Sequence, residues 1–186
     1  MDFLYKESEN PSLSLKVNSI PAVCADCSYT FNSAATPVTS SATLASNVMT
    51  LSITDPSSIG FALSDITVSL LGVQCTDLSG TIASFTCNFP TNADSSVALP
   101  AGSEKPKVHV SQIGFADDSS LSATSISLTV TSLTPSTSSP SGGIQATISG
   151  SGFPIDENGD FTITLCGNEV TEIISVNNQE IVFVVP

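Results

Sequence analysis

The sequence predicts an all-β protein, from its composition, its hydrophobic periodicity and its lack of helical patterning. Val, Ile, Thr and Ser dominate, and Gly and Pro interrupt the chain at short intervals, as is typical of strands joined by turns. Several short stretches alternate apolar and polar residues, which is the period of a strand with one buried face. No long window shows the i, i+3, i+4 apolar spacing of an amphipathic helix.

The composition also excludes some classes of partner. The 186 residues are 40% hydrophobic and only 11% charged, whereas disordered chains combine low hydrophobicity with high charge. The net charge is −13 with four Lys and no Arg, so the chain has few cations for phosphates or guanine bases, and we expect no nucleic-acid partner. No apolar run approaches the roughly 18 residues that span a bilayer, and Met1 does not begin a signal-peptide pattern. We therefore expect no direct membrane insertion, and expect an internal segment of a longer, exported protein.

The first 33 residues hold two short predicted strands. Residues 13–20 (LSLKVNSI) alternate apolar and polar side chains, and residues 27–31 (CSYTF) form a second run. Two strands alone are marginally stable in water, so this stretch needs further strands to fold.

Residues 34–130 hold six predicted strands separated by turns. Residues 37–44 form the first, and the other five carry large apolar residues at alternate positions. These residues are Met49, Leu51 and Ile53; Ile66, Val68 and Leu70; Phe85, Cys87 and Phe89; Val108 and Val110; and Ile126, Leu128 and Val130. Six such strands suit a two-sheet sandwich with one dry interior, and a segment of this size supplies enough aliphatic side chains to stabilise it.

Residues 131–153 begin a further segment. Ser, Thr and Pro fill residues 131–141, and Gly142-Gly143 follows as a turn, since Gly adopts backbone angles that other residues resist. Residues 144–148 then alternate apolar and polar side chains. Gly150 and Gly152 interrupt this strand, as at a bulge or a close approach of two backbones.

The remaining residues add further alternating runs. Their apolar members are Phe161, Ile163 and Leu165, then Ile173 and Ile174, then Ile181, Phe183 and Val185 before Pro186.

Residues 131–153 closely resemble the start of an IPT/TIG domain, the immunoglobulin-like module of plexins, fibrocystin-like receptors and polycystin-related surface proteins. In that family a strand ending in S-x-x-P leads through a GG turn into a strand ending in G-x-G-F. These elements are Ser132 to Pro135, Gly142-Gly143 and Gly150 to Phe153 here. In addition, CSYTF followed by Ala35-Thr36-Pro37-Val38 is similar to the junction between tandem fibrocystin-like repeats.

The resemblance implies tandem immunoglobulin-like β-sandwiches of the early-set type, incomplete at both ends. Residues 1–33 would be the last strands of an upstream repeat, residues 34–130 a complete repeat, and residues 131–186 the first part of a following repeat. The ending I-x-F-x-V-P is similar to the middle strand of the family, so the closing strands are expected beyond Pro186. Thr131 to Ser141 offers sites for O-linked sugar, but we interpret it as a stiff connector between repeats.

The five cysteines leave one without a partner in the chain. The resemblance implies a disulfide between Cys75 and Cys87, a recurrent pair in this family; the alternative is two buried thiols. Cys24 and Cys27 form a CxxC motif that lacks the four ligands of a zinc site and the helix of a redox site, so we expect a local disulfide or pairing with upstream strands. Cys166 is either a free thiol or paired beyond Pro186.

No catalytic constellation is present. The chain lacks a G-x-S-x-G elbow, and its single His, His109, lies between inward-facing Val108 and Val110 and should face solvent. We therefore expect no enzymatic activity and no cofactor. Starch binding is disfavoured because there is no Trp, and because Phe115 and Phe153 occupy positions typical of core edges.

One acidic stretch qualifies as a metal-site candidate. Asp156, Asn158 and Asp160 place oxygen atoms at alternate positions, as in the first half of an EF-hand loop. The sixth and twelfth positions of such a loop hold Phe161 and Gly167 instead of the required Gly and Glu. We therefore favour a polar hairpin turn and expect no metal.

For function, the resemblance implies a non-catalytic extracellular rod of IPT/TIG repeats in a cell-surface or ciliary filament or adhesion protein. Its partners would be neighbouring repeats of the same chain and other protein chains, contacted through sheet faces or loops. The alternative is a ligand-binding ectodomain segment of a plexin-like or fibrocystin-like membrane receptor. A Rel-like dimerisation module is disfavoured by the lack of Arg and by the implied disulfide.

Overall fold

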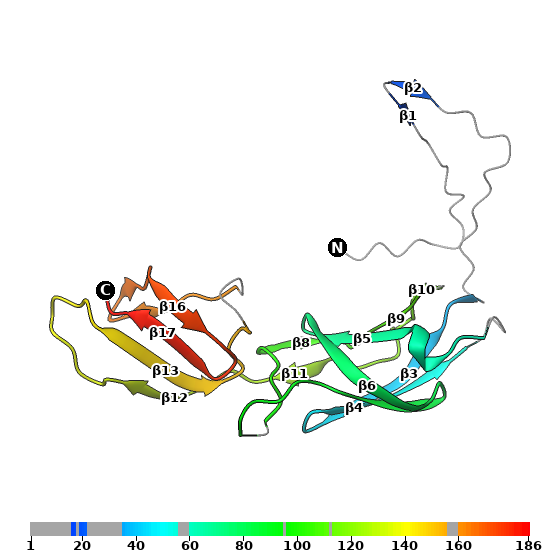
Figure 1. The fold of residues 1–186 in the computed structure, drawn as a ribbon, viewed down its shortest axis with the longest axis horizontal. Coiled ribbons are helices and arrows are strands. Elements are labelled where there is room, and N and C mark those ends of the chain that lie inside the picture. The colour runs from blue at the N-terminus through cyan, green and yellow to red at the C-terminus, as the bar shows by residue number, and fades with distance from the viewer. Residues whose placement is uncertain are drawn as a thin grey trace.

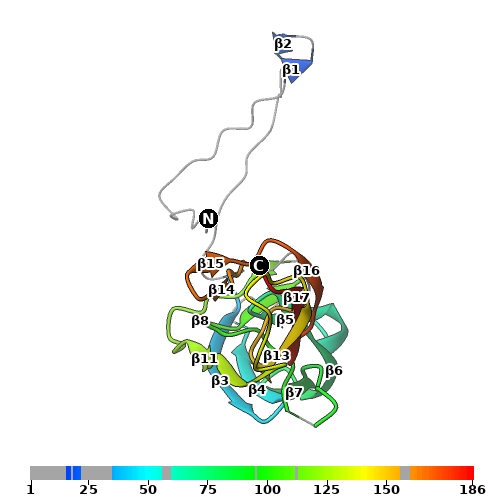
Figure 2. The same cartoon turned by 90° about the vertical axis from the view of Figure 1, so that its left-hand side faces the viewer.

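The computed structural model of the protein describes residues 16–17, 19–21, 35–55, 60–94, 96–111, 113–155 and 160–186. Their regular structure consists of antiparallel strands and short 3-10 segments such as η2 (Leu63–Asp65), which confirms the all-β prediction. In Figure 1, β3 to β11 lie together at one end and β12 to β17 at the other; Figure 2 looks along this direction from the side of β12 to β17, so the two parts overlap there. We call these parts the first and the second β unit.

The predicted strand at residues 13–20 is wrong. β1 (Lys16–Val17) and β2 (Ile20–Pro21) pair with each other in antiparallel orientation, so the chain reverses direction within this stretch. Ser19, between them, has a positive φ of 66°, which is typical of a turn. The other predicted strand of this region, residues 27–31, lies outside the described residues.

Seven strands of the first unit form one sheet in the order β10-β9-β5-β6-β7-β4-β3. They are β3 (Val38–Ala45), β4 (Val48–Thr54), β5 (Ile66–Leu70), β6 (Val73–Thr81), β7 (Ser84–Asn88), β9 (Lys107–Val110) and β10 (Gly114–Phe115). A separate pair, β8 (Gly102–Glu104) and β11 (Thr124–Ile126), lies on the side of the second unit (Figure 1).

This sheet closes on itself. The beginning of β6 pairs with β5 and the rest pairs with β7, with a register shift between Thr76 and Ser79 that bends the strand from one layer into the other. At the far ends of the sheet, Asp117 bridges Val38 in parallel orientation. The Thr39 N–H donates to the Asp117 carbonyl over 2.9 Å, so the two edges of the sheet satisfy each other's backbone groups.

The core of the first unit lies inside this closed sheet. It contains most of the alternating residues predicted from the sequence, because each strand turns one face inward. The fully buried members include Met49, Leu51, Val68, Cys87 and Val110, each at most 1% exposed. Phe85 and Phe89 fill the same interior.

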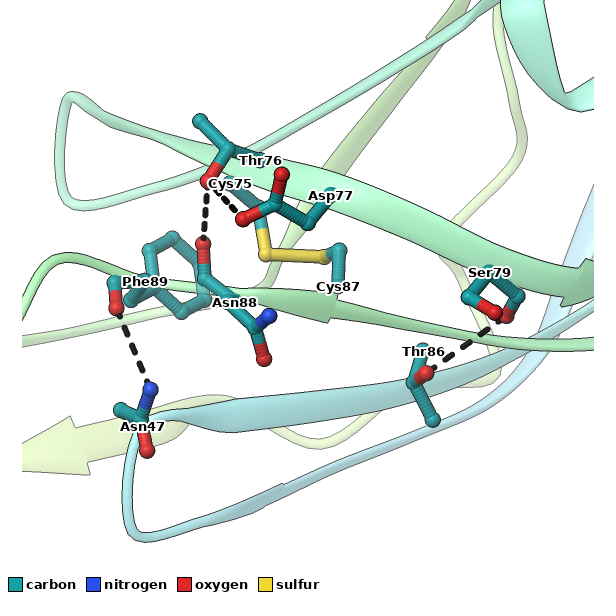
Figure 3. Close-up of a disulfide and its surroundings, with 9 residues drawn as sticks. All are labelled: Asn47, Cys75, Thr76, Asp77, Ser79, Thr86, Cys87, Asn88 and Phe89. Atoms are coloured by element: carbon teal, nitrogen blue, oxygen red, sulfur yellow. Dashed lines mark hydrogen bonds between the residues drawn. A yellow bond between two sulfur atoms is a disulfide. The ribbon is translucent and has the colours of Figure 1, made fainter.

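A disulfide joins the two layers of the first unit. Cys75 lies in the part of β6 that pairs with β5, and Cys87 lies in β7 next to β4. Their sulfur atoms are 2.08 Å apart and their Cα atoms 5.7 Å apart, so the pair implied by the resemblance is bonded (Figure 3). Both residues are buried, and the bond therefore lies within the core.

The second unit is built on a four-stranded sheet in the order β12-β13-β17-β16. Its strands are β12 (Thr129–Thr134), β13 (Gln145–Ser151), β16 (Ile173–Val176) and β17 (Glu180–Val184), and β14 (Thr164–Leu165) forms a separate hairpin with β15 (Asn168–Glu169). β17 is an interior strand of the sheet. Its small core contains Ala146, Val170 and Phe183.

Two predictions about residues 126–141 are wrong. Leu128 and Val130 do not close the first unit: Val130 lies in β12 of the second sheet, and both side chains are 60% exposed. The stretch from Thr131 to Ser141 is not a connector between repeats, because its first residues belong to β12 and the rest lies in the loop from β12 to β13. The predicted Gly142-Gly143 turn is confirmed in this loop, with φ values of 63° and 81°.

Candidate interaction surface at the junction of the two β units

Apart from the Cys75–Cys87 pair, most of the sequence-predicted site residues lie in parts of the chain that the structure does not describe. Cys24, Cys27, Asp156 and Asn158 lie outside the described residues, so the CxxC motif and most of the acidic loop have no structural account. Asp160 is exposed. Among the described residues, no group of three or more His, Cys, Asp or Glu side chains is placed to hold a metal ion.

His109 and the two Phe candidates occupy different environments. The His109 ring is half-buried and packs edge-on against Phe115, with ring centroids 5.0 Å apart. Phe115 is 68% exposed, so its assignment to a core edge is wrong, because the short edge strand β10 leaves its outer side uncovered. Phe153 is buried at the junction between the units.

Cys166 lies at the turn between β14 and β15, exposed and not bonded to any described cysteine. It has a positive φ of 53°, and Gly167 follows with 86°, as a two-residue hairpin turn requires.

Two glycines near the end of β13 lie against the backbone of the residues that enter the second unit. A Cβ atom added to Gly150 would collide with the carbonyl oxygen of Thr129, and one added to Gly152 would lie 2.5 Å from the carbonyl oxygen of Ser127. Gly152 also has a positive φ of 78°. The predicted close approach at these glycines is therefore confirmed: the chain that leaves the first unit lies directly against the end of β13.

Hydrogen bonds cross this junction. The Ala101 N–H of the first unit donates to the Gly152 carbonyl of the second over 2.8 Å. The Asn178 Nδ2 atom donates to the Leu99 carbonyl, also over 2.8 Å, and its Oδ1 accepts from the Asn92 side chain. Sequence reasoning missed Asn178. A turn composition in VNNQE was the only available signal, and it does not indicate which side chain turns inward.

An apolar groove of about 760 Å³ opens beside these hydrogen bonds. Both units line it, and Asp160 is the one charged residue among the described lining residues. Its apolar lining includes Leu71 and Pro100 from the first unit and Leu128, Val130, Ile155 and Phe161 from the second. Exposed apolar surface of this kind is typical of sites that bind another protein segment or a small molecule.

The Ser96 hydroxyl and the Asp94 carboxylate lie next to the Asn92 side chain at the junction. The Ser96 hydroxyl donates to Asp94 over 2.6 Å and the Ser96 N–H donates over 3.0 Å, and these bonds hold the pKa of the Asp94 carboxyl below its usual range. The first unit also pairs two of the few cations of the chain: Lys107 contacts Glu104 at 2.8 Å and Lys105 contacts Asp118 at 3.7 Å.

Comparison with known proteins identifies one part of the chain. The chain matches none of the curated proteins with which it was compared. No helix among the described residues is long and apolar enough to cross a membrane. A family model described as IPT/TIG domain matches residues 128–186, which begin where the chain enters β12. Residues 128–186 are therefore similar to the IPT/TIG domain, an immunoglobulin-like and generally non-catalytic module of protein–protein interaction, typical of extracellular and cell-surface proteins.

Proposed function

We propose that the chain is a non-catalytic, extracellular structural and interaction segment: a rod of IPT/TIG repeats in a cell-surface or ciliary filament or adhesion protein. The observation that carries the proposal is the packing of residues 128–186, which match IPT/TIG, directly against a second β unit. In this proposal residues 1–33 end an upstream repeat and the unit from residue 34 is a complete repeat. Residues 131–186 are the first part of a following repeat, and the IPT/TIG match at residues 128–186 and the start of β12 at Thr129 support an earlier start for it, at residue 128.

The cysteine chemistry supports an extracellular setting. The Cys75–Cys87 disulfide lies in the core of the first unit, and structural disulfides persist in oxidising compartments and are rare in the cytosol. The IPT/TIG match at residues 128–186 supports a module that acts by contact, because that family is generally non-catalytic.

Two measurements test this proposal. Peptide mapping of the protein from its native source under non-reducing conditions should recover Cys75 and Cys87 in one linked peptide pair; free thiols at both positions would refute the extracellular setting. Small-angle X-ray scattering of the isolated chain should give an elongated particle. A compact, monomeric particle would contradict a rod.

The alternative is a ligand-binding ectodomain segment of a membrane receptor. The groove between the units favours it, because the groove is apolar, open and lined from both units. A transmembrane helix followed by a signalling tail in the full-length gene product would favour the receptor, whereas an uninterrupted series of β repeats would favour the rod.

A further inference from the structure

The side chain of Asn178 is buried at the junction of the two units, where a polar group is costly unless all its hydrogen bonds are made. From its contacts we infer that Asn178 fixes the orientation of the two β units relative to each other and so holds the groove between them at one width. This inference goes beyond the proposed function and does not depend on it, since it concerns the joint and not the partner or the compartment.

Both the nitrogen and the oxygen of the Asn178 amide have hydrogen-bond partners. Asn178 is 3% exposed, and its Nδ2 atom donates to two carbonyl oxygens at 2.8 Å, that of Leu99 in the first unit and that of Phe153 in the second. Its Oδ1 atom accepts from Asn92 Nδ2 of the first unit at 3.0 Å. Carbonyl oxygens can only accept hydrogen bonds, so the Leu99 and Phe153 carbonyls must face the Nδ2 atom and not the Oδ1 atom. These neighbours therefore determine the orientation of the amide.

Asn178 is anchored firmly within its own unit. It lies in the turn between β16 and β17, where Asn177 makes the local bonds: Asn177 Oδ1 accepts from the N–H groups of Gln179 and Glu180 at 2.9 and 2.8 Å. The Gly150 N–H donates to the Gln179 carbonyl at 2.8 Å, which joins the turn to β13. Because Asn177 satisfies the turn, the side chain of Asn178 is available for the other unit.

The first-unit residues that bond to Asn178 are also held in place. Leu99 is completely buried, and the Ala98 N–H donates to the Pro90 carbonyl at 2.8 Å. The Asn92 side chain donates to the Ser96 hydroxyl at 3.0 Å in addition to Asn178. A displacement of either unit would therefore break several bonds at once and leave a buried amide and a buried carbonyl unpaired.

Domains joined by small interfaces are expected to move relative to each other, so a fixed joint needs such a device. The groove beside Asn178 is lined by Leu71 and Pro100 of the first unit and by Leu128 and Phe153 of the second. A joint that opens would separate these residues, whereas a fixed joint keeps the groove preformed and lowers the entropy cost of binding.

The experiment is ¹⁵N relaxation on the whole 186-residue chain, which reports the tumbling of each unit separately. In the unsubstituted protein, amides of β3 to β9 and of β12 to β17 should fit one common tumbling time. In Asn178→Ala the common time should be lost and each unit should tumble faster, while the amide shifts within each unit are retained. Separate tumbling in the unsubstituted protein, or common tumbling in folded Asn178→Ala, would overturn the inference.

Matched variants keep the test decisive if Asn178→Ala unfolds the second unit. Asn92→Ala removes a hydrogen bond across the junction and none within the second unit. The two units should then tumble more independently while β12 to β17 remain folded. An unchanged common tumbling time in Asn92→Ala would count against the inference. Thr131→Ala removes a hydrogen bond within the second unit, from the exposed Thr131 hydroxyl to the Ser149 carbonyl over 3.0 Å, and should leave the common tumbling in place. Equal separation of the two units in Thr131→Ala would assign the effect to any weakening of the second unit and contradict a specific role for Asn178.

Discussion

The two β units differ in how much of their sheet surface is covered. In the first unit the bridge between Asp117 and Val38 joins the ends of the sheet, and fifteen described residues are buried in one core. In the second unit the ends of the sheet, β12 and β16, are not joined to each other, and three residues make up the buried cluster. The large apolar groove lies over the second sheet.

This difference shows that strand content and unit stability are separate properties. A sheet gains most of its stability from the layer packed on its apolar face, and the first unit supplies that layer itself. Over the second sheet lies the groove, and Leu71, Pro100 and Ala101 of the first unit form part of its lining. The second unit should therefore be more sensitive to substitution, and more dependent on the junction, than the first.

The largest effect is expected from Phe→Ala substitutions in the two cores. Phe85 in the first unit and Phe183 in the second are 1% and 0% exposed, and truncation of a buried Phe costs about 3–5 kcal/mol. Because the second core is small, Phe183→Ala should lose the dispersed amide signals of β12 to β17, whereas Phe85→Ala should remain folded with a lower urea midpoint. Phe115→Ala, at a 68% exposed position, is the control, and its free energy of unfolding should stay within about 0.5 kcal/mol of that of the unsubstituted protein. If both β units remain folded in their respective variants, the second unit is not more sensitive to substitution than the first.

The disulfide should stabilise the first unit alone. Cys75 and Cys87 are 12 residues apart in sequence, and closing a loop of that size contributes about 3 kcal/mol in the chain-entropy model. In the Cys75→Ala/Cys87→Ala protein, the free energy of unfolding measured from amides of β3 to β9 should fall by about this amount, with little change in β12 to β17. Cys166→Ala, at an exposed turn, is the control. An equal loss in both units would mean that they unfold as one body.

A pair of glycines separates backbone strain from the close approach at the junction. Gly72 and Gly152 share a φ of 78°, but a Cβ at Gly72 meets nothing within 4 Å, whereas one at Gly152 meets the Ser127 backbone. Ala at either position bears the cost of a left-handed conformation, about 1–2 kcal/mol. Thermal unfolding should show a larger loss for Gly152→Ala than for Gly72→Ala. Equal losses would show that the backbone at residues 127 and 152 separates without cost.

Alternation of apolar residues predicted most strands of the first unit because those strands have one inward face, as with Met49 and Leu51. The same pattern failed for Leu128 and Val130, because periodicity shows which residues share a face and not whether another layer covers it. Composition misassigned residues 131–134, since Ser and Thr occur both in turns and on exposed strand faces. The role of Asn178 depends on carbonyl oxygens far away in the sequence, which no local pattern contains.

The smallest effect is expected at the uncovered face, and a pair of valines measures it. Val108 in β9 is 2% exposed and Val130 in β12 is 60% exposed. Val→Thr keeps the shape of the side chain but adds a hydroxyl, which costs about 1–3 kcal/mol where it is buried without a partner. Val108→Thr should therefore lower the free energy of unfolding by this amount, while Val130→Thr should change it by less than about 0.5 kcal/mol in urea titrations. A cost at Val130 as large as that at Val108 would mean that the face is covered in solution, and the contrast between a closed first unit and an open second unit would then be lost.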